Sequence, residues 1–142
     1  MSVLTACQRT PDEQRIRQAI ESAASAARDN DANGVLARVG DDFTGGDAEL
    51  DRRGLRQLLV VRALSHDKTG VVVGPISFER KPPILDRPTS DRIVATFNLT
   101  LTGGQFGGLL PDHAASYRMT TAWRREGGDW RCYYAKWAAA AR

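Results

Sequence analysis

The sequence predicts an α+β protein in which three helices are followed by a mainly antiparallel sheet of about four strands. Apolar residues recur every three or four positions between residues 11 and 65, whereas they alternate with polar residues between residues 69 and 137. A Gly-Gly pair at 127–128 joins the last two alternating stretches, as in a hairpin. Helices that all precede the strands indicate an α+β order, because a parallel α/β sheet requires helices and strands to alternate along the chain.

The first helix has a well-defined start. Thr10 is a good N-cap, Pro11 suits the first helical position, and Glu13 completes a capping box with Thr10. The apolar stripe that follows consists of Ile16, Ala19, Ile20, Ala23 and Ala27. Because most of these side chains are small, the helix is expected to lie close to whatever it packs on.

Two further helices are expected before the strands. Asn30 or Asp31 caps a short helix whose apolar positions extend to Val39, and Gly40 ends it. Asp51 caps a third helix, which ends near residue 65. The composition of residues 41–47 predicts a loop between these two helices.

The second half of the chain is expected to form the sheet. Gly74-Pro75 interrupts the first strand, which is therefore bulged or lies at an edge. The stretch 93–102 alternates most regularly, with one apolar and one polar face. A third strand is predicted at 115–125, and the last runs from Trp130 to Trp137 after a tight hairpin turn at 126–129.

Length and composition fit one domain. The chain has 142 residues, of which 42% are hydrophobic and 26% charged. We expect a tether at 1–10, the domain at 11–137 and a tail without a pattern at 138–142. A net charge of +3, with the charges interspersed, does not indicate a nucleic-acid partner. No apolar run approaches the ~18 residues of a transmembrane helix.

The N-terminal cysteine carries a separate signal. Leu4-Thr5-Ala6-Cys7 resembles a bacterial lipobox, in which a signal peptidase cleaves before a cysteine that then carries lipid. The resemblance implies lipidation of Cys7, and Gln8 after it implies sorting to the periplasmic side of the outer membrane. Only six residues precede Cys7, whereas a signal peptide needs a basic start and about 7–15 apolar residues. The alternative is an unstructured N-terminus on a cytoplasmic protein.

The order of the elements resembles the NTF2-like superfamily, which includes SnoaL-like and ketosteroid-isomerase-like proteins with a cystatin-type α+β cone. The resemblance rests on the long capped first helix, the short helix followed by Val39-Gly40-Asp41-Asp42-Phe43, the helix that opens at Asp51, and the hairpin 127–131. It implies a curved sheet that wraps against the helices and leaves a cone-shaped cavity. Because members of this superfamily include both enzymes and binding proteins, the fold does not settle the function.

The resemblance raises three kinds of active site, and the sequence completes none of them. A ketosteroid-isomerase-like site would use Asp47 as the base, but the first helix has no tyrosine to act as the donor. A dehydratase-like or cyclase-like site would use a His–Asp pair. The chain offers the adjacent pairs His66-Asp67 and Asp112-His113, and adjacent loop residues rarely face the same point.

The third kind of site, that of epoxide-hydrolase-like members, uses an Asp-Arg-Asp set. Asp91, Arg92 and Arg118 could supply these residue types, but neighbours along a strand point to opposite faces. Two scattered histidines do not indicate a metal site, and the Gly-rich stretch 103–108 lacks the pattern of a phosphate loop. We therefore expect no catalytic residues, no metal and no cofactor.

A binding cavity is the remaining expectation. The inward faces of the strands supply Phe97, Met119 and Trp123, with Tyr117, Thr121 and Tyr134 as the expected polar groups. Our first hypothesis is a non-catalytic envelope lipoprotein that binds a small apolar ligand or an envelope protein. The alternatives are an isomerase, dehydratase or cyclase that uses the cavity, and a cytosolic dimeric accessory domain.

A homodimer is expected through the outer face of the sheet. The residues on that face of the 93–102 strand, Val94, Thr96, Asn98 and Thr100, are uncharged, which is unusual for a strand face in water. A C₂ dimer is the commonest closed assembly.

Overall fold

The computed structural model describes residues 11–46, 50–64, 70–81, 92–102 and 115–139. Within these ranges the chain forms three helices and seven strands, so the predicted α+β order is confirmed, but the prediction of about four strands is too low. The elements are α1 (Pro11–Arg28), α2 (Ala32–Leu36), β1 (Val39–Gly45), β2 (Leu50–Asp51), α3 (Arg52–Leu64), β3 (Gly70–Val73), β4 (Ser77–Lys81), β5 (Arg92–Thr102), β6 (Ala115–Glu126) and β7 (Asp129–Ala139).

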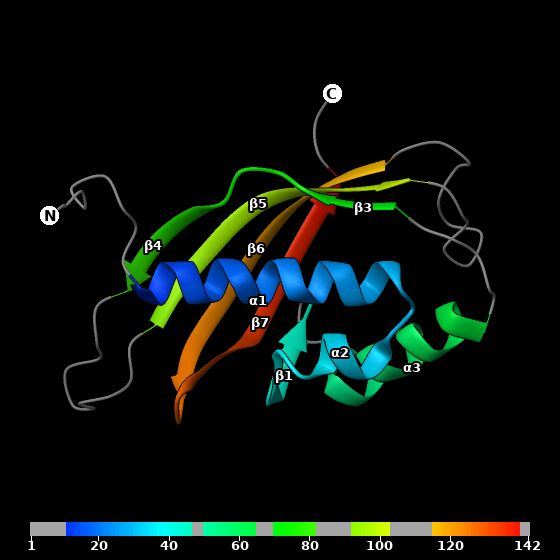
Figure 1. The fold of residues 1–142 in the computed structure, drawn as a ribbon, viewed down its shortest axis with the longest axis horizontal. Coiled ribbons are helices and arrows are strands. Elements are labelled where there is room, and N and C mark those ends of the chain that lie inside the picture. The colour runs from blue at the N-terminus through cyan, green and yellow to red at the C-terminus, as the bar shows by residue number, and fades with distance from the viewer. Residues whose placement is uncertain (1–10, 47–49, 65–69, 82–91, 103–114, 140–142) are drawn as a thin grey trace, which may run out of the picture.

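The described strands form one curved sheet in the order β2-β1-β7-β6-β5-β3, with β4 also paired to β5. All pairings are antiparallel except that of β1 with β7. Helix α1 crosses one face of the sheet, α2 lies beside the C-terminal half of α1, and α3 lies next to α2 (Figure 1). We call the face that α1 covers the inner face, and the opposite one the outer face.

Helices α2 and α3 begin at the caps that the sequence predicts. Asp31 Oδ1 accepts a hydrogen bond of 3.0 Å from the Gly34 amide, and Asp51 Oδ1 accepts one of 2.8 Å from the Gly54 amide. Each bond satisfies one of the amides that a helix N-terminus leaves without an intrahelical partner.

Strand β1 corrects the sequence prediction. Val39 was expected at the end of the second helix and residues 41–47 in a loop, yet Val39–Gly45 is a strand. The strand forms because its backbone pairs in parallel with β7, where Val39 lies opposite Cys132 and Thr44 opposite Tyr134. Phe43 is buried in the core, whereas Asp41 and Asp42 remain exposed.

Strands β3 and β4 share one sheet edge, as the Gly74-Pro75 interruption predicts. Both pair with β5, with Val73 opposite Leu99 and Ser77 opposite Thr96. The Gly74 amide still donates to the Asn98 carbonyl at 2.9 Å, so the interruption bends the edge without separating it from the sheet. The tight turn at 126–129 is confirmed too, and Gly127 adopts φ +64° there, which glycine tolerates without steric cost.

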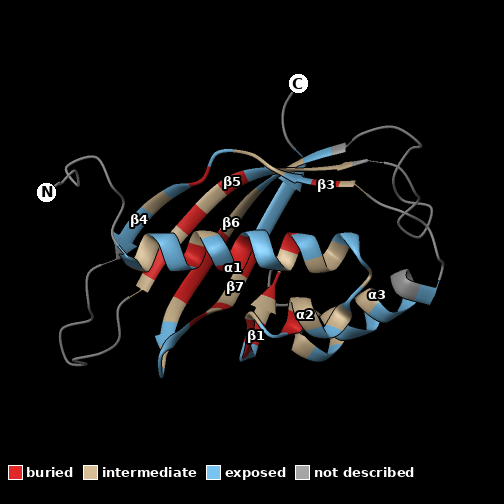
Figure 2. Cartoon of the chain, viewed as in Figure 1, coloured by how far each residue is buried: buried red, intermediate tan, exposed pale blue. Residues whose placement is uncertain are grey.

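Several of the most deeply buried residues lie under the N-terminal half of α1. Ile16 of α1 and Ile93 of β5 are fully buried there, together with Ala95 and Trp130, and Figure 2 shows buried stretches of the sheet behind the helix. A polar contact closes the same end. Asp12 Oδ1 accepts from Arg125 at 2.9 Å and from Trp130 Nε1 at 3.3 Å. We call this region the closed end.

The C-terminal strand is longer than the sequence suggests. Strand β7 continues to Ala139, so residues 138 and 139 are not part of a structureless tail, and residues 140–142 lie outside the described ranges.

Among the described residues, no helix is long and apolar enough to cross a membrane.

Candidate functional site: an apolar cavity

A cavity of about 490 Å³ lies between the three helices and the inner face of the sheet. Most of its lining is apolar and comes from every helix and from six of the strands. The lining residues are Ile20, Ala23, Ala24, Ala27, Val35, Arg38, Val39, Phe43, Leu50, Leu55, Leu58, Val71, Val73, Phe97, Leu99, Leu101, Tyr117, Met119, Thr121, Trp123, Cys132, Ala135 and Trp137.

Helix α1 leaves room for the cavity because its side chains become smaller along the helix. Ile16 fills the space over the sheet in the first half of α1, whereas in the second half the cavity is lined by Ile20 and then by the small side chains of Ala23, Ala24 and Ala27. Arg28 holds the end of the helix in place, because its guanidinium donates a 2.6 Å hydrogen bond to the Val71 carbonyl of β3.

Five of the six residues that the sequence assigns to a pocket line this cavity. They lie on β5 and β6 and are Phe97, Tyr117, Met119, Thr121 and Trp123. These two strands pair directly with each other in an antiparallel arrangement, with Phe97 opposite Met119 and Leu99 opposite Tyr117. Whether these residues bind a ligand remains a prediction.

Tyr134 is the exception. The register of β6 and β7 shifts by one residue, so that Trp123 lies opposite Cys132 but Ala122 lies opposite Tyr134. This bulge leaves two consecutive residues, Tyr133 and Tyr134, between the inward-facing Cys132 and Ala135. Tyr134 therefore belongs to the outer face with Ala122, and strict alternation along β7 gives the wrong face.

The two most buried polar groups of the wall satisfy each other. Thr121 Oγ1 donates to the Ala95 carbonyl at 2.8 Å and accepts from Trp123 Nε1 at 2.8 Å. Hydrogen-bonded polar groups in a buried wall carry no desolvation penalty that a ligand would have to offset. This part of the wall is consequently apolar in effect, although it contains a hydroxyl and an indole N–H.

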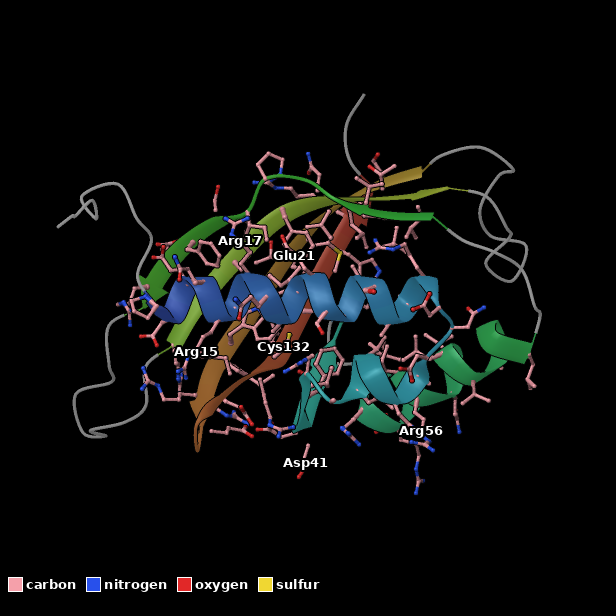
Figure 3. The ribbon with its side chains drawn as sticks, viewed as in Figure 1. Arg15, Arg17, Glu21, Asp41, Arg56 and Cys132 are labelled. Carbon is pink, nitrogen blue, oxygen red and sulfur yellow. The ribbon has the colours of Figure 1, made fainter. Side chains whose placement is uncertain are left out.

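Cys132 is a buried thiol and not a nucleophile. It lies between α1 and the sheet (Figure 3), and its Sγ donates to the Tyr134 carbonyl at 3.2 Å. Burial raises the pKa of this thiol to about 12. The thiol therefore stays protonated at neutral pH, as expected for a small buried residue in a strand.

Arg38 and Tyr117 bring further polar groups to the lining, in addition to the indole N–H of the exposed Trp137. Arg38 donates only a long hydrogen bond of 3.5 Å to Ser22 Oγ, and it forms no ion pair with any carboxylate of the described residues. The Tyr117 hydroxyl forms no hydrogen bond within the same ranges. Both groups can therefore serve a polar part of a ligand.

The candidate catalytic residues do not assemble in the described part of the cavity wall. Asp47, His66, Asp67, Asp91, Asp112 and His113 lie outside the described residues. Arg92 and Arg118 lie on the outer face, where Arg92 stacks on Tyr133 and Arg118 donates to Asn98 at 3.3 Å. Within the described ranges, no three His, Cys, Asp or Glu residues lie close enough to hold a metal ion.

Sequence reasoning missed the wall that the short elements provide. Val35, Phe43, Leu50 and Leu55 line the cavity from α2, β1, β2 and α3. The alternating pattern around Phe43 is only a few residues long, and its pairing partner is the distant strand β7. The apolar side of the third helix could have indicated that this helix contributes to the wall, since Leu55 and Leu58 both lie on that side and line the cavity.

Comparisons with known proteins identify the fold and leave the activity open. No family model matches the sequence, and no curated protein matches it. An NTF2-like protein from Cytophaga hutchinsonii aligns over 92% of this chain and 100% of its own, at 16% identity and a TM-score of 0.69. An NTF2-like protein with a cystatin-like fold from Novosphingobium aromaticivorans aligns over 90% and 81%, at 17% identity and a TM-score of 0.68.

A third similar structure is a candidate scytalone dehydratase from Novosphingobium aromaticivorans. It aligns over 92% of this chain and 85% of its own, at 10% identity and a TM-score of 0.66. Together these likenesses show that the chain has the NTF2-like fold, as its resemblance implies. At such low identities they do not transfer an activity.

Proposed function

From an NTF2-like fold with an apolar cavity, we propose that this protein binds a small, mainly apolar ligand and performs no chemistry on it. The observation that carries the proposal is the composition of the wall, in which the buried polar groups of Thr121 and Trp123 are already paired. A volume of about 490 Å³ lies within the usual range of small-molecule sites, roughly 300–1,000 Å³.

The described wall offers no acid–base pair. General acid–base catalysis needs a group whose pKa lies near the working pH. The Cys132 thiol is held protonated by its burial, so it does not supply such a group. The wall is instead suited to a ligand that is largely apolar and has one polar or anionic group near Arg38 or Tyr117.

The binding test uses a filled cavity and a matched control. The uncharged dye N-phenyl-1-naphthylamine is titrated into the protein, and its fluorescence should rise with saturation at one site. Ala23→Phe, which places a ring in the cavity, should weaken binding at least about tenfold. Ser25→Phe on the exposed side of the same helix should leave binding unchanged. Absence of saturable binding by the wild-type protein would overturn the proposal.

The alternative enzyme function has one point in its favour, namely the candidate scytalone dehydratase among the structural neighbours. A dehydratase would need an acid–base pair from residues outside the described ranges, such as His66 or Asp47. Turnover of a hydroxy-ketone that His66→Ala abolishes, with dye binding intact, would favour the enzyme over the binding protein.

We propose in addition that Cys7 is lipidated and that the protein resides in a bacterial envelope, where the partner is either the ligand or an envelope protein. The support is the lipobox-like Leu4-Thr5-Ala6-Cys7. Mass spectrometry of the membrane fraction, after expression from the full gene, should find a lipid-modified N-terminus that Cys7→Ser abolishes. An unmodified, soluble product would contradict this.

The homodimer is proposed through the outer face of the sheet. Val94, Ala122 and Tyr134 form one uncharged row across β5, β6 and β7, and the next row consists of Thr96, Thr120 and Lys136. Sedimentation at high micromolar concentration should show a dimer that Thr96→Arg weakens and Ser25→Arg does not. A monomer at that concentration would refute the proposal.

A further inference from the structure

Helix α3 presents a face that the rest of the described fold leaves uncovered. Val61 is 66% exposed and Leu64 69%, although both are apolar residues of the last turn and a half of the helix. Isolated exposed apolar residues are ordinary, but these neighbours lie on one side of one helix and form a continuous patch. Leu58 extends the patch toward the cavity and is 58% exposed.

The same helix is strongly basic. From Arg52 to Leu64 it contains four arginines and no acidic residue. Arg53 and Arg56 are exposed, and neither forms an ion pair with a described residue. Figure 3 shows Arg56 pointing away from the fold. The exposed side of α3 thus begins with positive charge and ends with apolar side chains.

We infer that this face of α3 docks the protein onto an anionic lipid surface. A helix with arginines and large apolar residues on its exposed side is suited to the boundary between headgroups and acyl chains. The arginines would contact lipid phosphates, while Val61 and Leu64 enter the acyl region. An anionic membrane offers phosphates to the basic half of this face and acyl chains to its apolar half, whereas water leaves the apolar half exposed.

Trp137 supports the inference independently, because it comes from a different element. It is 41% exposed and lies against β1, where a Cβ at Gly45 would come within 3.1 Å of its ring. Trp137 and Leu58 are the two exposed members of the cavity lining, so the cavity opens beside them. Tryptophan favours the membrane interface, since its ring is apolar and its N–H is polar.

Docking through α3 would place the cavity mouth at the lipid surface. An apolar ligand could then pass between the bilayer and the cavity without crossing water. This last consequence rests on the proposed ligand binding, whereas the docking itself rests only on the exposed residues of α3 and β7.

The test measures partition of the full 142-residue chain, produced without lipid modification, onto vesicles of stated composition. Phosphatidylcholine vesicles with about 30% phosphatidylglycerol should bind the protein, and pure phosphatidylcholine vesicles should bind it much less. Binding to the anionic vesicles should fall as salt is added. The double variant Arg53→Gln/Arg56→Gln should reduce the partition coefficient about 25-fold, since each basic residue near such a surface contributes about fivefold.

A matched pair of variants separates this face from general surface effects. Val61→Asp should abolish vesicle binding, whereas Val72→Asp should not, although Val72 is also an exposed valine (57%) on β3. Failure of the wild-type protein to bind anionic vesicles would overturn the inference, as would equal losses in the two variants. Self-association without vesicle binding, removed by Val61→Asp, would also overturn it and assign the face to a second copy of the chain.

Vesicle binding is measured without ligand, and dye binding without vesicles. A failure of α3 docking is therefore distinguishable from a failure of the proposed ligand binding.

Discussion

The two ends of helix α1 differ in what lies beneath them. At the closed end Ile16 is fully buried in the core, and Asp12 joins the helix to Arg125 and Trp130. At the other end, which we call the open end, Ala23 and Ala27 face the cavity across from Leu99 and its neighbours.

The same helix and the same pair of strands, β5 and β6, span both ends, so the difference does not lie in secondary structure. It lies in side-chain volume along α1 and in the contact that fixes each end of the helix. Alanines alone would let the helix approach the sheet, because interiors tend toward close packing. The hydrogen bond of 2.6 Å from Arg28 to the Val71 carbonyl holds the helix end at the sheet edge instead. We therefore attribute the cavity both to the small residues of α1 and to the Arg28 side chain that fixes the end of the helix.

The largest expected effect compares one apolar residue from each end of β5. Ile93→Ala at the closed end should reduce the free energy of unfolding by about 2–5 kcal/mol, because it empties a fully packed site. Leu99→Ala at the open end should cost less than half as much, because part of the Leu99 side chain already faces the cavity. Urea denaturation measures both, and equal losses would show that the cavity is collapsed in solution.

A smaller effect is expected from the polar contact at the closed end. Asp12→Ala removes the acceptor for Arg80, Arg125 and Trp130, and it should lower the free energy of unfolding by about 1–3 kcal/mol. Asp29→Ala, just beyond the C-terminal end of α1, should be nearly neutral. Thermal unfolding of the two variants gives the comparison, and a neutral Asp12→Ala would show that apolar packing alone closes this end.

Cys132 reports whether the open end admits solvent. In a Cys7→Ser background, its thiol should react with a maleimide far more slowly than a free thiol, because burial raises its pKa to about 12. The unfolded thiol titrates near 9.0, so the free energy of unfolding that this group contributes should fall as the pH rises from about 9 toward 12. Rapid labelling of the native protein at neutral pH would show that the cavity wall opens.

The smallest expected effect concerns the outer face beside the closed end. Arg124 donates to Asp42 at 2.6 Å, and this hydrogen bond lowers the pKa of the Asp42 carboxyl. The pair is exposed, so Asp42→Asn should cost less than about 1 kcal/mol. The cost should be present above the ordinary carboxyl pKa of 3.8 and vanish as the pH falls through the lowered value. A cost that persists at lower pH would mean that the carboxylate charge is not its source.

Local patterns were sufficient for much of the fold. The alternation along 93–102 correctly separates the buried Ile93, Ala95 and Phe97 from the outer face. The Gly-Gly pair fixes the hairpin, and the aspartates at 31 and 51 fix the starts of two helices. Each of these signals acts within a few residues, where one side chain or one turn determines the backbone.

The cavity wall was predictable only in part, for a reason that β7 makes clear. Its five correctly placed members come from regular strands, where alternation assigns the face. Tyr134 was placed wrongly because a bulge shifts the alternation at Tyr133, and no residue in β7 signals that bulge. The lining residues of β1 and β2 were not predicted, because β1 joins the sheet by pairing with the distant strand β7 and β2 joins it by pairing with β1.

The sequence by itself determined the α+β order, the helix starts, the hairpin and the apolar character of the inner face. All of these follow from short-range preferences and from the periodicity of apolar residues. Only the tertiary structure decided that β1 is a strand, that Tyr134 faces outward and that the space above Leu99 remains open. These features depend on contacts between segments that are distant in the sequence. Strand β1 forms because Val39 pairs with Cys132, and the cavity stays open because Arg28 reaches the Val71 carbonyl.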